Sequence, residues 1–141
     1  MTFAVEAANL TRSFDSGSRA ALEGVTLHVN EGERVLLTGP SGSGKSTLLN
    51  LIGCLDRPSS GLLSVGGVAV EKLGEHRLAR IRRTVVGIVF QHHFLPTGLT
   101  AEEVVAAPLL WSKNLSAHEA LEEARGLLND LDLSAAECAR P

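Results

Sequence analysis

The chain has 141 residues and a formal net charge of −3, and 44% of its residues are hydrophobic. This composition fits one modest globular domain, or a piece of a larger one, and excludes a disordered chain. The sequence shows no apolar run near the ~20 residues that cross a bilayer, and its N-terminus lacks a secretory signal pattern. We therefore expect an intracellular, soluble chain.

The first two thirds of the chain predict a β-rich fold. Short apolar runs of strand type, separated by turn residues, lie at 3–7, 25–29, 34–38, 62–65, 68–70 and 85–90. Gly66-Gly67 indicates a hairpin between two of these runs. A helix with leucines on its buried side is expected at 47–53, and Cys54, which follows it, is expected to be a buried thiol and not a metal ligand.

Between the 34–38 run and this helix lies a phosphate-binding pattern, G-x-x-x-x-G-K-[ST]. Its residues are Gly39, Pro40, Ser41, Gly42, Ser43, Gly44, Lys45, Ser46 and Thr47. Glycines let the backbone N–H groups approach a polyphosphate, and the helix that follows directs its positive end at the same anion. Lys45 would reach the β- and γ-phosphates, and the Ser46 hydroxyl would bind Mg²⁺. The alternative is a glycine-rich turn with an incidental lysine.

After about Phe94 the pattern becomes helical and acidic. Residues 94–141 hold 3 Lys/Arg against 8 Asp/Glu, whereas residues 1–93 hold 10 against 8. Thr100 and Ser116 each begin a capping-box pattern, which predicts helices to about Pro108 and about Leu131. The face of the second helix is expected to consist of Leu121, Ala124, Leu128 and Leu131. We place a boundary between 1–93 and 94–141.

The chain resembles the ATP-binding subunit of ATP-binding cassette (ABC) transporters along nearly its whole length. The resemblance is carried by 22–33, the phosphate loop with 46–50, Gly53, 55–61 and Val89-Phe90-Gln91. The Leu-Asp-Arg-Pro-Ser-Ser-Gly segment at 55–61, with 94–97 and 99–102, is most similar to the branch that serves lipoprotein-release and macrolide-type exporters.

This resemblance implies an α/β P-loop NTPase fold in truncated form. An antiparallel β subdomain would be joined to a P-loop strand and helix and to the start of a helical subdomain. Gln91 corresponds to the Q-loop glutamine, which in the family contacts Mg²⁺ and the attacking water; an ordinary strand-end glutamine is the alternative. Phe14 occupies the place of the aromatic residue that stacks on adenine, with a core phenylalanine as the alternative.

Other residues have a functional and a plain interpretation. His92 and His93 suggest a metal, but neighbours in an extended segment point to opposite sides, which favours exposed loop histidines. Arg77, Arg80, Arg82 and Arg83 suggest nucleic acid, but without interleaved aromatics they favour a solvated helix face, and we expect no nucleic-acid partner. Trp111 would either contact a membrane partner or pack locally.

The resemblance implies an ATP hydrolase with ATP and Mg²⁺ as ligands. Its partners would be transmembrane permease subunits and, in the full-length form, a second ATPase subunit, at the inner face of the cell membrane. The family's signature loop, Walker B pair and switch histidine are not among these 141 residues, so we expect ATP binding at most and interpret the chain as an N-terminal portion. The alternatives are a non-catalytic fragment that only docks on a partner, and another kind of P-loop kinase or NTPase.

Overall fold

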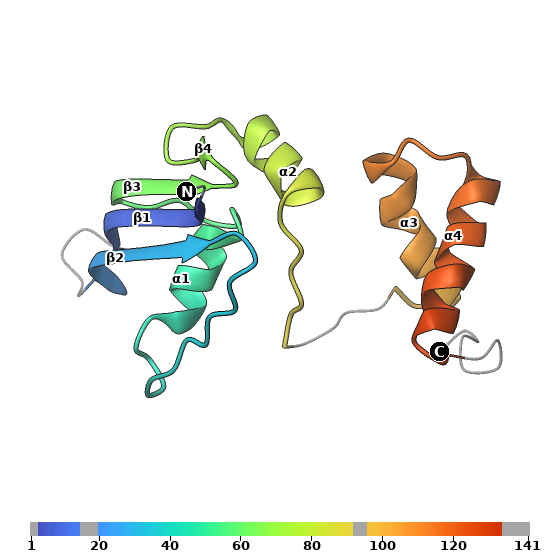
Figure 1. Cartoon of the computed structure of the whole chain (residues 1–141), viewed down its shortest axis with the longest axis horizontal. Coiled ribbons are helices and arrows are strands. Elements are labelled where there is room, and N and C mark those ends of the chain that lie inside the picture. Colours follow the sequence, from blue (N-terminus) through green and yellow to red (C-terminus); the bar gives the residue numbers. More distant parts are fainter. Residues whose placement is uncertain (1–2, 15–19, 92–95, 134–141) are drawn as a thin grey trace. The chain divides into compact units, whose positions relative to one another are not determined.

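The computed structural model describes residues 3–14, 20–91 and 96–133. Its backbone contacts divide the chain into two compact units, Met1–Ile88 and Val89–Pro141. The described part of the first unit holds four strands and two helices, and that of the second holds two helices (Figure 1). Each unit is described by itself below.

The first unit is built on an antiparallel sheet with the order β2-β1-β3-β4. The strands are β1 (Phe3–Arg12), β2 (Leu22–Asn30), β3 (Ser60–Val65) and β4 (Val68–Ala69). Ala7 in β1 pairs with Leu27 on one side and with Leu63 on the other. The hairpin predicted at Gly66-Gly67 is confirmed, since it joins β3 to β4 with φ of 56° and 75°, a conformation that glycine adopts without strain.

Helix α1 (Lys45–Ile52) packs on one face of this sheet, and α2 (Glu75–Thr84) adds Leu78 and Ile81 to the same core. The fully buried side chains of the core include Leu10 of β1, Leu51 of α1 and Leu63 of β3. Leu63 and Val65 of β3 point into this core because side chains alternate along a strand, and an irregularity of register between Ala7 and Leu10 of β1 brings both of these side chains into it. Cys54 is buried as predicted.

Two of the predicted strands do not form. Residues 34–38 and 86–90 have no regular secondary structure, and Figure 1 shows the chain after β2 passing beside α1 without joining the sheet. Leu36 is 86% exposed and Val89 is 90% exposed. A strand needs a neighbour for its backbone N–H and C=O groups, and the described residues offer these runs no ladder partner.

The second unit pairs α3 (Ala101–Ser112) with α4 (Ala117–Asp130). Both predicted capping boxes are present: the hydroxyl oxygens of Thr100 and Ser116 accept from the N–H groups of Glu103 and Glu119. The core is formed mainly by small residues, which lets the two helices approach closely; its buried members are Ala106, Ala120 and Ala124.

The predicted end of α3 needs correction, whereas α4 ends at Asp130 with Leu131 as its C-cap, close to the predicted end. Helix α3 continues through Pro108 to Ser112. A proline in a helix removes one backbone hydrogen bond, and the packing of Leu109 and Leu110 against the core of this unit offsets that loss. In α4, Ala124 and Leu128 are buried as predicted, but Leu131 lies beyond the last helical residue and is 71% exposed.

Within the part of the chain that the structure describes, no helix is long and apolar enough to cross a membrane.

The capping box of α4 predicts a pH-dependent stability. Hydrogen bonds from the Ser116 hydroxyl and N–H lower the pKa of the Glu119 carboxyl. A lowered folded pKa means that the stabilisation is fully present above the unfolded value of about 4.3 and is lost as the pH falls through the folded pKa. We expect Glu119→Gln to destabilise α4 at pH 7 and to lose this effect toward pH 3, measured by urea unfolding with circular dichroism.

Glu122→Gln is the matched control for this experiment, because Glu122 lies in the same helix and forms only an exposed ion pair with Arg125. An equal effect of both substitutions at pH 7 would show that the Glu119 carboxylate does not cap the helix.

Candidate functional site

The end of the loop before α1 lies close to the residues at the start of β2. Gly44, the residue before the helix, has φ +88°. A Cβ atom there would lie 2.5 Å from the carbonyl oxygen of Ala21 and 2.7 Å from a methyl of Leu22. Only glycine fits this backbone conformation and this space. The helix therefore starts at a defined point beside the beginning of β2.

The side chain of Lys45 folds back over this loop. Its ammonium Nζ donates to the carbonyl oxygens of Gly39 and Pro40, both at 2.7 Å, and lies 3.4 Å from the Ser43 hydroxyl. The lysine thus places a positive charge at the loop. An ammonium group has three donors, and the loop offers three acceptors in this arrangement.

The N-terminus of α1 has no side-chain cap and no acidic residue in its first turn. The first N–H groups of a helix have no partner within the helix and carry a partial positive charge. Ser46 is exposed at this end of the helix. A cavity of about 490 Å³ lies there, lined by Ala21 and by all residues from Ser41 to Thr47. The arrangement can bind a polyphosphate through N–H groups and one ammonium group.

Phe14 lies just beyond the end of β1. Its side chain is 62% exposed, so the alternative of a core phenylalanine is wrong. The guanidinium carbon of Arg12 lies 4.7 Å from the centre of the phenyl ring. The backbone N–H of Ala21 donates to the carbonyl of Arg12 at 2.8 Å, so Ala21 joins the end of β1 to the lining of the cavity. Sequence reasoning singled out neither Arg12 nor Ala21.

The remaining candidate residues lie in the second unit or outside the described residues. Gln91 is exposed and belongs to the second unit, and its role stays a prediction. Trp111 is 72% exposed, which contradicts local packing. His92 and His93 lie outside the described residues. Among the residues that are described, no group of three or more His, Cys, Asp or Glu side chains could hold a metal ion.

The arginines of α2 divide into two kinds. Arg77, Arg80 and Arg83 are exposed, as a solvated helix face requires. Arg82 instead donates to the carbonyl of Cys54 at 2.6 Å and to the Glu75 carboxylate at 2.5 Å. Burial raises the pKa of the Cys54 thiol, and the Arg82 charge offsets part of that rise. Arg82 therefore ties α2 to the end of α1.

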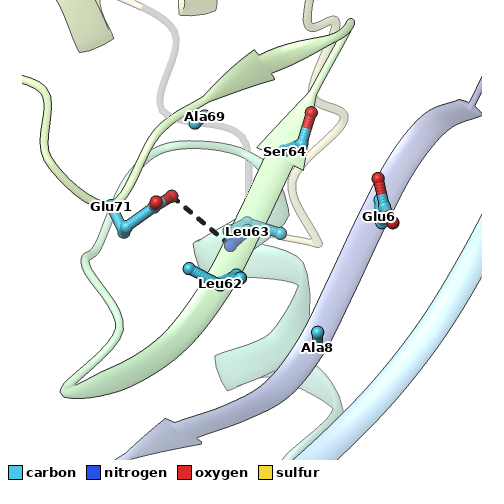
Figure 2. Close-up of a pocket in the computed structure, with 7 residues that line it drawn as sticks. All are labelled: Glu6, Ala8, Leu62, Leu63, Ser64, Ala69 and Glu71. Carbon is cyan, nitrogen blue, oxygen red and sulfur yellow. Dashed lines mark hydrogen bonds between the residues drawn. The ribbon is translucent and has the colours of Figure 1, made fainter.

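A second hollow, of about 190 Å³, lies on the sheet face opposite α1 (Figure 2). Ala8, Leu62 and Ala69 form its apolar part, and Glu6 and Glu71 bring carboxylates to it. Figure 2 shows Glu71 directed at the backbone N–H of Leu63, with a separation of 3.4 Å. Two carboxylates repel a polyphosphate, so this hollow is not a phosphate site.

Comparisons with protein families, single proteins and solved structures all point to ATP-binding cassette proteins. The family model for ABC transporters matches residues 22–140. The macrolide export ATP-binding/permease protein MacB of Rhodospirillum rubrum is 43% identical over 133 residues, which are 93% of this chain and 20% of that protein. An uncharacterized ABC transporter ATP-binding protein of Thermotoga maritima is 46% identical over 108 residues, which are 77% of this chain and 46% of that protein.

Solved structures of the ATP-binding cassette MJ0796 share the fold. A dimeric post-hydrolysis state of that cassette bound to ADP and Pi matches with a TM-score of 0.87 and 37% identity. The match covers 97% of this chain and 61% of the cassette. By comparison, the chain spans only about a fifth of the length of the MacB relatives. The predicted P-loop NTPase fold of an ABC ATPase and the resemblance to macrolide-type exporters are confirmed.

The contact at Gly44 predicts a strong effect of a single methyl group. Gly44→Ala places a Cβ in the left-handed region and 2.5 Å from a backbone carbonyl, so we expect a loss of ~1–3 kcal/mol of unfolding free energy, measured in urea. Gly87→Ala is the control, because it adds the same methyl group where no atom lies within 4 Å. Equal stabilities of the two variants would contradict the close approach of Gly44 to β2.

Proposed function

Because the chain belongs to the ABC transporter family, we propose that it is the ATP-binding part of a transport ATPase. ATP with Mg²⁺ binds at the loop before α1. In the whole protein, its hydrolysis drives transport through a membrane permease. One observation carries this proposal: the Lys45 ammonium group and the uncapped N-terminus of α1 meet at one cavity lined by Ala21 and residues 41–47.

Two kinds of group in the loop bind the phosphates: backbone N–H groups and the Lys45 ammonium. Backbone N–H groups between Gly42 and Thr47 bind phosphate oxygens, since glycine and serine side chains leave the backbone accessible. A phosphate group competes with the Gly39 and Pro40 carbonyls for the Lys45 ammonium, because an ammonium binds an anionic oxygen more strongly than a neutral carbonyl oxygen.

Ser46 and Gln91 suit a magnesium site. Hydroxyl and amide oxygens are hard ligands, which Mg²⁺ prefers, and the ion keeps most of its ligands as water and phosphate oxygens. When bound, Mg²⁺ neutralises phosphate charge and orients the terminal phosphate group. Ser46 is exposed at the helix start and would hold the ion, and the Gln91 amide would orient the attacking water.

In the whole protein this part works with partners. Relatives that combine an ATP-binding part with a permease, and a cassette solved as a dimer, support a permease partner and a second ATPase subunit. Both would act at the inner face of the cell membrane. The exposed Trp111 of α3 suits a contact with the permease, because tryptophan is enriched at the centre of protein interfaces.

The first test is ATP binding by the 141-residue chain with Lys45→Ala. Losing a charge-assisted hydrogen bond to phosphate costs ~1.5–3 kcal/mol, so we expect at least about tenfold weaker binding by calorimetry. No ATP turnover is expected from these 141 residues. Lys72→Ala is the matched control, because it removes the same charge from an exposed position outside the loop. Equal affinities of the two variants would refute the role of the loop.

The second test concerns the base. Stacking of a base on an aromatic ring contributes about 1–3 kcal/mol, so Phe14→Ala should weaken ATP binding roughly tenfold. Phe14→Tyr keeps the ring and should bind ATP like the original chain. Unchanged affinity in Phe14→Ala would show that Phe14 does not stack on adenine.

A further inference from the structure

The segment that follows α1 fixes the backbone just before Phe14. The Ser59 hydroxyl accepts from the Ser13 N–H at 3.0 Å and donates to the Ser13 carbonyl at 3.2 Å. The Ser59 N–H donates to the Thr11 carbonyl at 2.8 Å. Three hydrogen bonds from one residue thus hold the end of β1, although the two segments lie more than forty residues apart in the sequence.

The same segment fixes the side chain that covers Phe14. Arg12 Nε donates to Asp56 Oδ2 at 2.8 Å, and both side chains are about three quarters buried. The other carboxylate oxygen of Asp56 accepts from the Arg57 N–H at 2.7 Å. Because both oxygens have a donor, the carboxylate has one orientation, and it holds the guanidinium 4.7 Å from the ring of Phe14.

Asp56 is also attached to the helix that carries Lys45. The N–H groups of Leu55 and Asp56 donate to the carbonyl of Asn50, in the last turn of α1. Helix α1 therefore begins at the phosphate loop and ends at the residue that orients Arg12. One short helix therefore connects the phosphate loop to the segment that holds Arg12 beside the ring of Phe14.

We propose that Arg12, oriented by Asp56, is a positioning residue for the base of the nucleotide. This inference rests on the proposed function. Arg12 occupies one face of the Phe14 ring, so the base stacks on the other face. The guanidinium also restrains the ring of Phe14, which is 62% exposed. A ring that is held in place before binding loses less conformational entropy when the base stacks.

A purely structural ion pair would act differently. A pair near the surface contributes little to stability, about 0–1 kcal/mol, and would affect all ligands alike. A positioning role affects only ligands that have a base. Inorganic triphosphate has the phosphates of ATP without the base, and it therefore separates the two roles.

The experiment compares the affinities of Mg-ATP and magnesium triphosphate for the 141-residue chain by calorimetry. Arg12→Gln and Asp56→Asn should each weaken ATP binding about two- to fivefold, the factor expected for an exposed cation–π contact, and leave triphosphate binding unchanged. Arg83→Gln is the control, since it removes the same charge from an exposed position on α2. Arg12→Gln in a Phe14→Ala background should cause no further loss.

The two substitutions also separate positioning from simple charge. Arg12→Gln removes a positive charge and Asp56→Asn removes a negative one. A long-range charge effect would change phosphate binding in opposite directions, and it would do so for both ligands. Weaker ATP binding in both variants, with constant triphosphate binding, is the result that only positioning explains.

Other results overturn the inference in distinguishable ways. If Phe14→Ala loses affinity for ATP and Arg12→Gln does not, Phe14 stacks on the base without help from Arg12, and the proposed function remains. If both variants weaken ATP and triphosphate equally, the pair only stabilises the fold. If the original chain binds neither ligand, the proposed function is wrong and this inference is wrong with it.

Discussion

The close approach of Gly44 to the carbonyl of Ala21 is the constraint on which the site depends. It places the N-terminus of α1 beside the first residues of β2, and so brings a helix end with free N–H groups against a rigid sheet. A side chain at this position would separate the two elements by the size of a methyl group or more. Gly44 thereby fixes the end of the phosphate loop from which α1 begins.

A second attachment joins α1 to the same sheet, this time through β1. Arg12 of β1 forms an ion pair with Asp56, whose backbone N–H donates to a carbonyl in the last turn of α1. Helix α1 is thus tied to the β1–β2 end of the sheet both at its start, through Gly44, and after its end, through Asp56. Two attachments restrict rotation of a short helix far more than one does. An eight-residue helix has little stability of its own, and these contacts, with the burial of Leu48 and Leu51, keep it in place.

Local patterns predicted the parts of the structure that depend on local chemistry. The phosphate loop, the Gly66-Gly67 hairpin and both capping boxes each need particular residue types over a few positions, and the structure has the hairpin and the caps as expected. The strands at 34–38 and 85–90 were predicted from apolar character alone. Apolar residues can favour a strand, but they cannot supply its hydrogen-bonded neighbours.

These local patterns could not predict which side chains pair across long distances in the sequence. Arg12 and Asp56 are 44 positions apart, and neither has a sequence pattern that names its partner. The helix predicted to end at about Pro108 continues to Ser112, because the packing of α3 overrides the usual effect of a proline in a helix. The predicted functions of Gln91 and Trp111 remain proposals, because both depend on what these residues contact in a complete, nucleotide-bound protein.

The two halves of the proposed nucleotide site use different physical forces, and this explains their different construction. Phosphate binding depends on charge, which acts over several ångströms and tolerates a mobile lysine side chain. Stacking depends on contact between flat surfaces and fails if the ring turns away. Lys45 is accordingly held only by hydrogen bonds to loop carbonyls and the Ser43 hydroxyl, which a phosphate can replace. By contrast, the backbone just before Phe14 is fixed by hydrogen bonds to Ser59. The ring of Phe14 lies against the Arg12 guanidinium, which Asp56 keeps in one orientation.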